Sequence, residues 1–253
     1  MSNQIATFLL AVQFLTRIPI PSGNLYTPER LNAAAGYYPL VGFLIGGICA
    51  GVFWLAALIV PIPLALLFAI AAGLLLTGAF HEDGLADTFD GIGGGHDRDQ
   101  ALAIMKDSRL GTYGTLALIM ALAIKFVALI ALPSVWIVAA LIVGHGLSRL
   151  SSVIVITTSR YARSDGKAKP VAEGIALSRL LFAMGTGLIG LAVASHWVPI
   201  TALAAGLIGL AAGHAGMRFL FERKLNGYTG DTLGAVQQAS ELGFYVGLVI
   251  WLS

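Results

Sequence analysis

The sequence predicts an all-α fold, a polytopic transmembrane helical bundle of about seven spans with an additional N-terminal interfacial or re-entrant helix. Hydrophobic residues make up 57% of its 253 positions and charged residues only 11%, where a soluble domain has roughly 25% charged residues. Apolar segments follow one another along the chain, and most charged residues lie in the connections between them. A chain of this composition cannot cover itself with polar surface, so we expect a lipid bilayer around most of it.

The N-terminal stretch from Asn3 to Arg17 is apolar but short. Polar residues interrupt it at Asn3, Gln4, Thr7, Gln13 and Thr16. The stretch has neither the basic start nor the small-residue cleavage site of a signal peptide. We therefore expect a helix that lies in the membrane interface or re-enters the membrane, and not a cleaved signal.

The apolar segments that follow are long enough, or nearly long enough, to cross a hydrocarbon core of about 30 Å as helices. Their connections are short and no Pro/Ser-rich linker separates them, so we expect one integral-membrane domain over residues 1–253. The expected spans are 36–60, 64–80, 113–132, 135–158, 176–194, 200–220 and 233–252.

Three connections between the spans are tight and carry no Lys, Arg, Asp or Glu. They are Pro61-Ile62-Pro63, Leu132-Pro133-Ser134 and Ser195-His196-Trp197-Val198-Pro199. The other connections hold nearly all the charge, so the positive-inside rule places them in the cytoplasm. We therefore expect any chemistry on the cytoplasmic face and the C-terminus on the opposite face.

The main polar motif follows the second expected span and reads His81-Glu82-Asp83-Gly84-Leu85-Ala86-Asp87-Thr88-Phe89-Asp90-Gly91. If the helix of 64–80 continues past the membrane surface, Asp83, Asp87 and Asp90 fall within an arc of roughly 60°. Carboxylates this close repel one another unless a divalent cation neutralises them, and Mg²⁺ or Mn²⁺, completed by substrate phosphates, suits such ligands. Glu82 points roughly 100° away from the arc and is the weaker ligand candidate.

The acidic residues and the glycines of this region each have an alternative interpretation. The acidic residues could form a solvated helix face or cap the next element, but their periodicity and their place at the membrane surface favour a metal site. Gly84, Gly91 and Gly93-Gly94-Gly95 could be helix breakers, or they could let phosphate oxygens approach the bare backbone closely.

A second motif, from Ile104 to Gly114, follows on the same expected face. Lys106 and Arg109 lie one helical turn apart and can present two cations to a diphosphate, while Asp107 could add a ligand or a base. Taken alone, such a basic pair is more often an anchor at the membrane surface. Beside a carboxylate cluster, the two interpretations are evenly matched.

A third polar block, Leu225 to Gly234, precedes the last expected span. Thr229, Asp231 and Thr232 are plausible N-caps of the helix that follows. A glycine-punctuated loop that enters a helix N-terminus is also a natural anion site, so Thr229 and Gly230 are candidate substrate contacts.

Three charged residues stand out within the apolar spans, namely Lys125, Arg149 and Glu241. A charge in lipid costs several kcal/mol unless it is paired or hydrated, so each is a functional candidate. Arg149 lies about two turns from the cytoplasmic end and could bind substrate there. Lys125 is a further candidate substrate contact, with a structural Lys125–Glu241 ion pair as the alternative. We expect His145 and His214 to be packing residues.

Charge and cysteine content exclude several classes. The formal net charge is +2 and basic residues mix with acidic ones, which argues against nucleic acid as the main partner. The lone Cys49 lies in an apolar stretch, so it forms neither an internal disulfide nor a cysteine-rich metal site.

Three long motifs occur in a characteristic order. They are His81-x-Asp83-Gly84-Leu85-Ala86-Asp87-Thr88-x-Asp90-Gly91, Ile104-Met105-Lys106-Asp107-Ser108-Arg109-Leu110-Gly111-Thr112 and Thr229-Gly230-Asp231-Thr232-Leu233-Gly234-Ala235. With Phe14-Leu15-Thr16-Arg17-Ile18-Pro19 and Ser148-Arg149, they resemble the cobalamin synthase family, the adenosylcobinamide-GDP ribazoletransferases of bacterial corrinoid biosynthesis. The likeness covers nearly the whole chain. It departs from the family pattern at Glu82, where a member of the family has an apolar residue.

The resemblance implies a reaction, its cofactor and its partners. A guanylyl-activated cobinamide joins α-ribazole, or its 5′-phosphate, and GMP is released at the cytoplasmic side of the bacterial inner membrane with Mg²⁺ as cofactor. The implied partners are the corrinoid nucleotide, α-ribazole and the lipid bilayer. A homo-oligomer or a corrinoid-assembly complex is compatible with the resemblance.

Roles for the candidate residues follow from the chemistry of diphosphates. The carboxylates that would hold one or two Mg²⁺ ions against the diphosphate are Asp83, Asp87 and Asp90. Lys106 and Arg109 would stabilise the departing GMP. Asp107 or Asp231 would accept the proton of the attacking hydroxyl, and the sequence does not choose between them.

Two other classes of protein have similar features. A membrane transferase of the CDP-alcohol or polyprenyl type uses Asp-rich motifs with Mg²⁺, but the CDP-alcohol pattern needs an Arg where this chain has Asp87. The polyprenyl type needs two Asp-rich sequences, and the block at 226–234 has one Asp. A small transporter would use Lys125, Arg149 and Glu241 as its pathway, and no inverted repeat is visible to support that reading.

Overall fold

The computed structural model describes residues 3–21, 23, 25–163 and 175–253, and within these ranges the regular secondary structure is helical apart from one isolated bridge, Tyr161 with Tyr228. The helices are α1 (Asn3–Leu15), α2 (Pro28–Ala34), a 3₁₀ turn η1 (Ala35–Tyr37), α3 (Tyr38–Ala56), α4 (Ile62–Thr77), α5 (Phe80–Gly94), α6 (Arg98–Ile104), α7 (Thr112–Ile130), α8 (Ser134–Thr158), α9 (Leu177–Ala194), α10 (Ile200–Leu225) and α11 (Gly230–Leu252).

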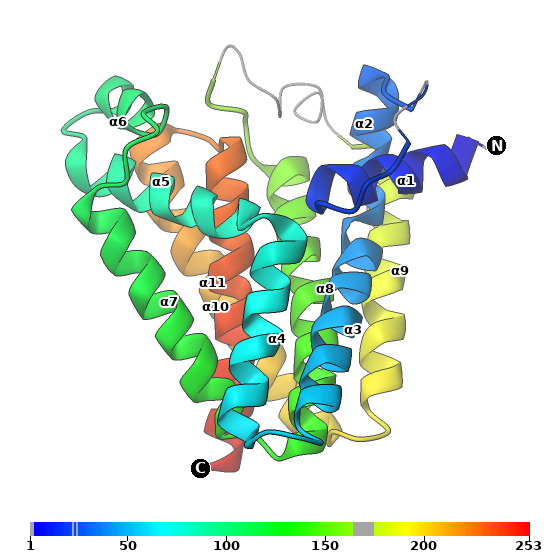
Figure 1. The fold of residues 1–253 in the computed structure, drawn as a ribbon. Helices are drawn as coiled ribbons and strands as arrows, with labels where there is room; N and C mark the ends of the chain where they lie inside the picture. Colours follow the sequence, from blue (N-terminus) through cyan, green and yellow to red (C-terminus); the bar gives the residue numbers. More distant parts are fainter. Residues whose placement is uncertain (1–2, 22, 24, 164–174) are drawn as a thin grey trace.

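Each of the seven expected spans coincides with a helix of a bundle made by α3, α4, α7, α8, α9, α10 and α11 (Figure 1). Among the described residues, five helices are long and apolar enough to cross a membrane, and the bent pair α4–α5 would make a sixth. The polytopic helical bundle is therefore confirmed, and the chain is a multi-pass membrane protein. The first half of α11 is polar, so the seventh span stays a prediction.

The three uncharged turns lie together at one end of the bundle, where the C-terminus also lies (Figure 1). A proline precedes α4, α8 and α10, at Pro61, Pro133 and Pro199, with φ of −57°, −55° and −54°. Proline cannot extend the preceding helix, and its fixed φ suits the start of a new one. The arrangement in Figure 1 confirms the expectation that the three turns share one end of the bundle.

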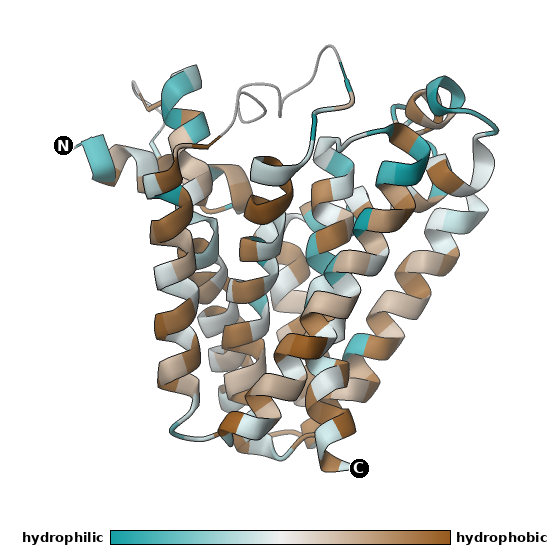
Figure 2. Ribbon diagram, turned by 180° about the vertical axis from the view of Figure 1, so that it is seen from behind, coloured by the Kyte–Doolittle hydropathy of each residue, from teal (hydrophilic) through white to brown (hydrophobic). Residues whose placement is uncertain are grey.

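The other end, which we call the polar end, carries α1, α2, α5 and α6. Figure 2 shows hydrophilic residues gathered there and hydrophobic ones along the bundle. Helix α1 runs across this end and not along the bundle (Figure 1), as expected of an interfacial helix.

The helix of 64–80 does not run on into the acidic motif, so the condition on which the helical spacing was considered is not met, although one separate helix still carries the three Asp residues. Helix α4 ends at Thr77, and α5 starts again at Phe80 after a bend of 85°. Gly78 and Ala79 both have left-handed backbones, with φ of 64° and 54°, and glycine in this conformation commonly ends a helix. A Cβ on Gly78 would collide with the guanidinium of Arg17, so the bend is also packed against the N-terminal segment.

The bend turns α5 across the polar end and onto the start of α11 (Figure 1). The two helices approach closely at Gly84, where a Cβ would lie 2.6 Å from the carbonyl oxygen of Asp231. Only glycine allows this approach. The approach brings the main polar motif next to the third polar block, although the two are far apart in the sequence.

Candidate active site

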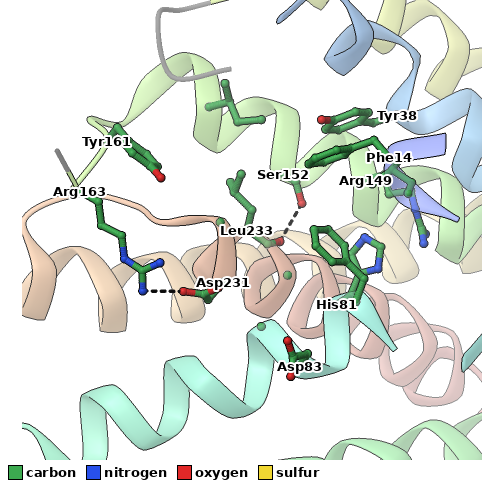
Figure 3. Close-up of a pocket in the computed structure, with 16 residues that line it drawn as sticks. Phe14, Tyr38, His81, Asp83, Arg149, Ser152, Tyr161, Arg163, Asp231 and Leu233 are labelled. Atoms are coloured by element: carbon green, nitrogen blue, oxygen red, sulfur yellow. Dashed lines mark hydrogen bonds and ion pairs between the residues drawn. The ribbon is translucent and has the colours of Figure 1, made fainter. Parts of the chain in front are cut away.

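A cavity of about 400 Å³ opens at the polar end, between α1, α3, α5, α8, α11 and the segment after α8 (Figure 3). This volume is within the range of small-molecule sites. Its charged lining residues are Asp83, Arg149, Arg163 and Asp231. Its apolar and aromatic lining includes Phe14, Leu15, Tyr38, Phe80, Ile156 and Leu233. The cavity therefore combines both charge signs with surfaces on which an aromatic ring can pack.

The acidic residues of α5 form a row that starts at this cavity. Asp83 lines the cavity, and Asp87 lies one turn further along the helix. Partial burial, together with the nearby carboxylates of Asp83 and Asp231, raises the pKa of Asp87 to about 7. Three acidic groups from two helices are thus close enough to affect one another.

Asp90, at the far end of the row, has a different environment from the other two. Its carboxylate accepts hydrogen bonds from the backbone N–H groups of Gly111 and Gly114, both at 2.8 Å, and so caps the first turn of α7. A Cβ on either glycine would collide with the Asp90 carboxylate. Asp90 therefore caps a helix, as one interpretation of the acidic residues expects, and its role as a metal ligand stays a prediction.

No group of three His, Cys, Asp or Glu side chains in the described ranges is placed to hold a metal ion. Asp83 and Asp87 could contribute two carboxylates, and the remaining ligands would come from water and from substrate oxygens. Mg²⁺ is usually bound in this manner, through one or two carboxylates plus phosphates. The role of Asp83 and Asp87 as metal ligands stays a prediction.

The third polar block contributes the opposite wall of the cavity. Thr229 is the N-cap of α11 and forms a capping box with Thr232, which confirms the cap interpretation for Thr229. The neighbouring Gly230 lines the cavity, as does Asp231. The Asp231 carboxylate lies 2.9 Å from Nη2 of Arg163 and accepts a hydrogen bond of 3.3 Å from the Thr229 hydroxyl.

The second motif is not part of the cavity lining. Asp107 and Arg109 pair with each other on the surface, with Nη2 of Arg109 at 2.5 Å and its Nε at 3.0 Å from Oδ2 of Asp107. These hydrogen bonds lower the pKa of Asp107, which makes it a weaker base. Lys106 also lies in this connection between α6 and α7, away from the cavity lining. Their catalytic roles stay predictions that the geometry does not support.

A buried polar network lies deeper in the bundle. Lys125 Nζ is 3.0 Å from Glu241 Oε1, so the ion-pair interpretation is right for these two residues. The other Glu241 oxygen accepts a hydrogen bond of 2.7 Å from Gln237 and lies 3.3 Å from Nδ1 of His145. Lys125 does not line the main cavity, and its predicted substrate contact is not supported.

Arg149 lies between this network and the main cavity. Its Nη1 donates to the backbone oxygen of His145 at 2.9 Å, but its buried Nε has no hydrogen-bond partner within the described part of the chain. Glu82 belongs to the network side, where its Oε1 accepts a hydrogen bond of 2.9 Å from Gln238. Glu82 therefore points away from the cavity that Asp83 lines, as its place on the helix predicts.

The basic lining residues His81 and Arg163 were not singled out from the sequence. His81 belongs to the acidic motif and received no role, yet it is buried in the cavity wall together with Arg149. Arg163 lies in a loop with several charged residues, where no periodicity distinguishes one of them. Only the tertiary contact with Asp231 identifies Arg163.

The chain is similar in sequence to known proteins over nearly its whole length. A sequence model of the cobalamin-5-phosphate synthase family matches residues 7–249. An adenosylcobinamide-GDP ribazoletransferase of Shewanella woodyi is 44% identical, covering 98% of this chain and 96% of the relative. Enzymes of the same name from Shewanella frigidimarina and Leptothrix cholodnii are also 44% identical, covering 96% and 99% of this chain and 94% and 96% of the relatives. No solved structure matches the chain.

Proposed function

The chain belongs to the cobalamin-5-phosphate synthase family, a family of transferases in cobalamin biosynthesis, and we propose that it joins adenosylcobinamide-GDP to α-ribazole or its 5′-phosphate. GMP is the second product. The observation that supports this most is the cavity in which Asp83 and Asp231 approach each other from α5 and α11 beside Arg149. Carboxylates and a cation at one site suit a diphosphate substrate.

The cavity accommodates the reacting part of the substrates. At about 400 Å³ it is too small for a whole corrinoid nucleotide, so it takes the diphosphate and one aromatic base while the corrin ring stays outside. Phe14 and Tyr38 stack at 6.0 Å between ring centroids on the apolar side of the cavity. A planar base can pack against this pair, as aromatic rings do in buried sites.

The carboxylates of Asp83 and Asp87 fit the implied Mg²⁺. They are hard oxygen donors, and burial together with the nearby carboxylates of Asp83 and Asp231 raises the pKa of Asp87. When bound, Mg²⁺ neutralises the diphosphate charge as GMP departs. In this proposal Asp90 holds α7 in place and does not contact the metal.

The remaining steps use residues of the chain. Arg149, whose Nε has no hydrogen-bond partner among the residues that the structure describes, binds the phosphate on the cobinamide side. The 5′-oxygen of α-ribazole attacks that phosphorus, the anhydride P–O bond breaks, and GMP leaves with the bridging oxygen. The hydroxyl proton passes to the carboxylate of Asp231. Asp231 is preferred to Asp107 because it lines the cavity and because burial raises its pKa.

The proposal includes the orientation of the chain. The charged connections between the spans lie at the polar end, so the positive-inside rule places the cavity on the cytoplasmic side of the inner membrane. A cysteine placed at Ser134 should be labelled from the periplasm, and one placed at Gly94 from the cytoplasm. The reverse labelling would overturn the orientation.

An activity assay tests the proposal. Purified full-length chain in detergent is incubated with adenosylcobinamide-GDP and α-ribazole, and GMP release is measured with Mg²⁺ and with excess chelator. We expect GMP release with Mg²⁺ only. Absence of turnover in a folded sample, with α-ribazole or with its 5′-phosphate, would falsify the assignment.

A further inference from the structure

Arg163 has an incomplete set of partners. It lies in the segment after α8, its side chain is 13% exposed, and it lines the cavity. Nη2 is 2.9 Å from Asp231 Oδ2, but neither Nε nor Nη2 makes a hydrogen bond of good geometry among the described residues. A guanidinium carries five N–H donors, and buried donors without acceptors are costly. The group therefore lacks acceptors that a ligand can supply.

We propose that Arg163 is a second anchor for the diphosphate and is held by Asp231 until the substrate enters. This inference rests on the proposed function and adds to it a binding residue and its partner exchange. When the diphosphate binds, the guanidinium leaves Asp231 for phosphate oxygens, and the freed Asp231 carboxylate faces the attacking hydroxyl. Figure 3 shows Arg163 and Asp231 joined across the cavity wall, with Asp83 on the facing helix.

The charges in the cavity explain why such an exchange is favourable. With Asp83 and Asp231 in its walls, the cavity repels a diphosphate unless cations offset the carboxylates. Arg163 exchanges one oxyanion for another, so its charge stays paired throughout. The planar fork of arginine binds two phosphate oxygens at once, which its contact with a single Asp231 oxygen does not satisfy.

A purely structural role for the Arg163 side chain is less consistent with its surroundings. The backbone next to it is already fixed, because Ala162 N donates to Tyr228 O and Tyr228 N donates to Arg160 O, both at 2.8 Å. Arg98 also donates to the backbone oxygen of Ala162 at 2.5 Å. The segment therefore stays in place without the Arg163 guanidinium, and substitutions of Arg163 should fold.

Binding of inorganic pyrophosphate to the full-length chain, measured by calorimetry in detergent with Mg²⁺, tests the anchor. We expect Arg163→Gln to weaken binding about tenfold or more, the effect of losing one charged hydrogen-bonded pair, and Arg163→Lys to lose less. The matched control is Arg218→Gln, because Arg218 makes an ion pair of 2.9 Å with Glu222 outside the cavity. This control should bind like wild type.

A second variant tests the exchange itself. Asp231→Asn releases Arg163, so pyrophosphate should bind more tightly than to wild type when Mg²⁺ is absent. The gain should vanish in the double variant Asp231→Asn with Arg163→Gln. The anchor is overturned if wild type does not bind pyrophosphate, if Arg163→Gln binds as wild type does, or if the double variant keeps the gain.

The two hypotheses fail in different ways. If the chain releases no GMP from adenosylcobinamide-GDP but pyrophosphate binding still depends on Arg163, the proposed function fails and the anchor stands. If GMP release is normal while Arg163→Gln changes neither pyrophosphate binding nor the KM for adenosylcobinamide-GDP, the function stands and the anchor fails.

Discussion

Two charged regions of this molecule differ in how completely their groups are paired. In the deep network, Lys125 and Glu241 form a buried ion pair, and Gln237 and Tyr245 donate further hydrogen bonds to the carboxylate. At the polar end, Asp83 lines a cavity, and Arg163 has N–H donors that find no acceptor within the described ranges.

The difference in pairing distinguishes charged groups that stabilise the fold from charged groups that can bind a ligand. Opposite charges that satisfy one another inside lipid hold helices together, and removing one of them leaves the other uncompensated. Groups that stay partly unpaired beside a cavity are arranged for a ligand. Lys125 and Glu241 are therefore weaker functional candidates than the charged groups that line the cavity.

The largest expected effect is on stability, from the deep network. Lys125→Met leaves the Glu241 carboxylate buried without its cation, so we expect the free energy of unfolding to fall by about 3–5 kcal/mol. Unfolding by SDS in mixed micelles measures it. The double variant Lys125→Met with Glu241→Leu should recover much of the loss. If Lys125→Met were as stable as wild type, the ion pair with Glu241 would not contribute to the stability of the fold.

The next largest effect is on activity, from the cavity. Asp83→Asn removes a predicted metal ligand, and we expect GMP release to fall about a hundredfold or more with little change in stability. Asp90→Asn should instead lower the free energy of unfolding by about 1–2 kcal/mol, because it weakens the cap on α7. Equal losses of activity in Asp83→Asn and Asp90→Asn would restore the single-face metal site. An equal loss in Glu82→Gln would mean that the single-face arrangement is wrong.

A smaller effect is expected in the pH dependence of metal binding. The Asp87 carboxyl has a pKa of about 7, so at a lower pH it is mostly protonated and Mg²⁺ must displace a proton to bind. Affinity should therefore rise by up to about tenfold per pH unit as the pH increases towards 7, and then level off. Calorimetric titration with Mg²⁺ measures this. The same slope in Asp87→Asn would show that another group titrates.

The smallest effect is expected from the surface pair of the second motif. Arg109→Gln breaks an exposed ion pair with Asp107, and such pairs contribute little, so GMP release should change by less than about threefold. A hundredfold loss would bring the connection between α6 and α7 into the active site and support the original prediction for Lys106 and Arg109.

Much of the fold follows from local signals. Long apolar segments place the spans, and the prolines before α4, α8 and α10 place the uncharged turns. The bend between α4 and α5 was missed because Gly78 alone is a weak stop signal. The bend also packs against the side chain of Arg17, which is distant in the sequence, so local signals do not reveal this contact.

The site was predictable only in part. Spacing on a helix places Asp83, Asp87 and Asp90 on one face, but it does not show that Gly111 and Gly114 lie opposite Asp90. Arg163 shows the same limit, because its importance depends on Asp231, which is contributed by another helix. The motifs therefore identified two segments that meet at the cavity, the first and the third, while tertiary packing excluded the second motif and decided which side chains face the cavity.

One comparison tests the division between the two regions most directly. GMP release per folded molecule is measured with Mg²⁺ for Asp83→Asn and for Lys125→Met with Glu241→Leu. We expect GMP release by Asp83→Asn to fall about a hundredfold while the variant remains folded. GMP release by the double variant of the network should stay within a few fold of wild type. A network variant that is folded but inactive, beside an active Asp83→Asn, would contradict this division.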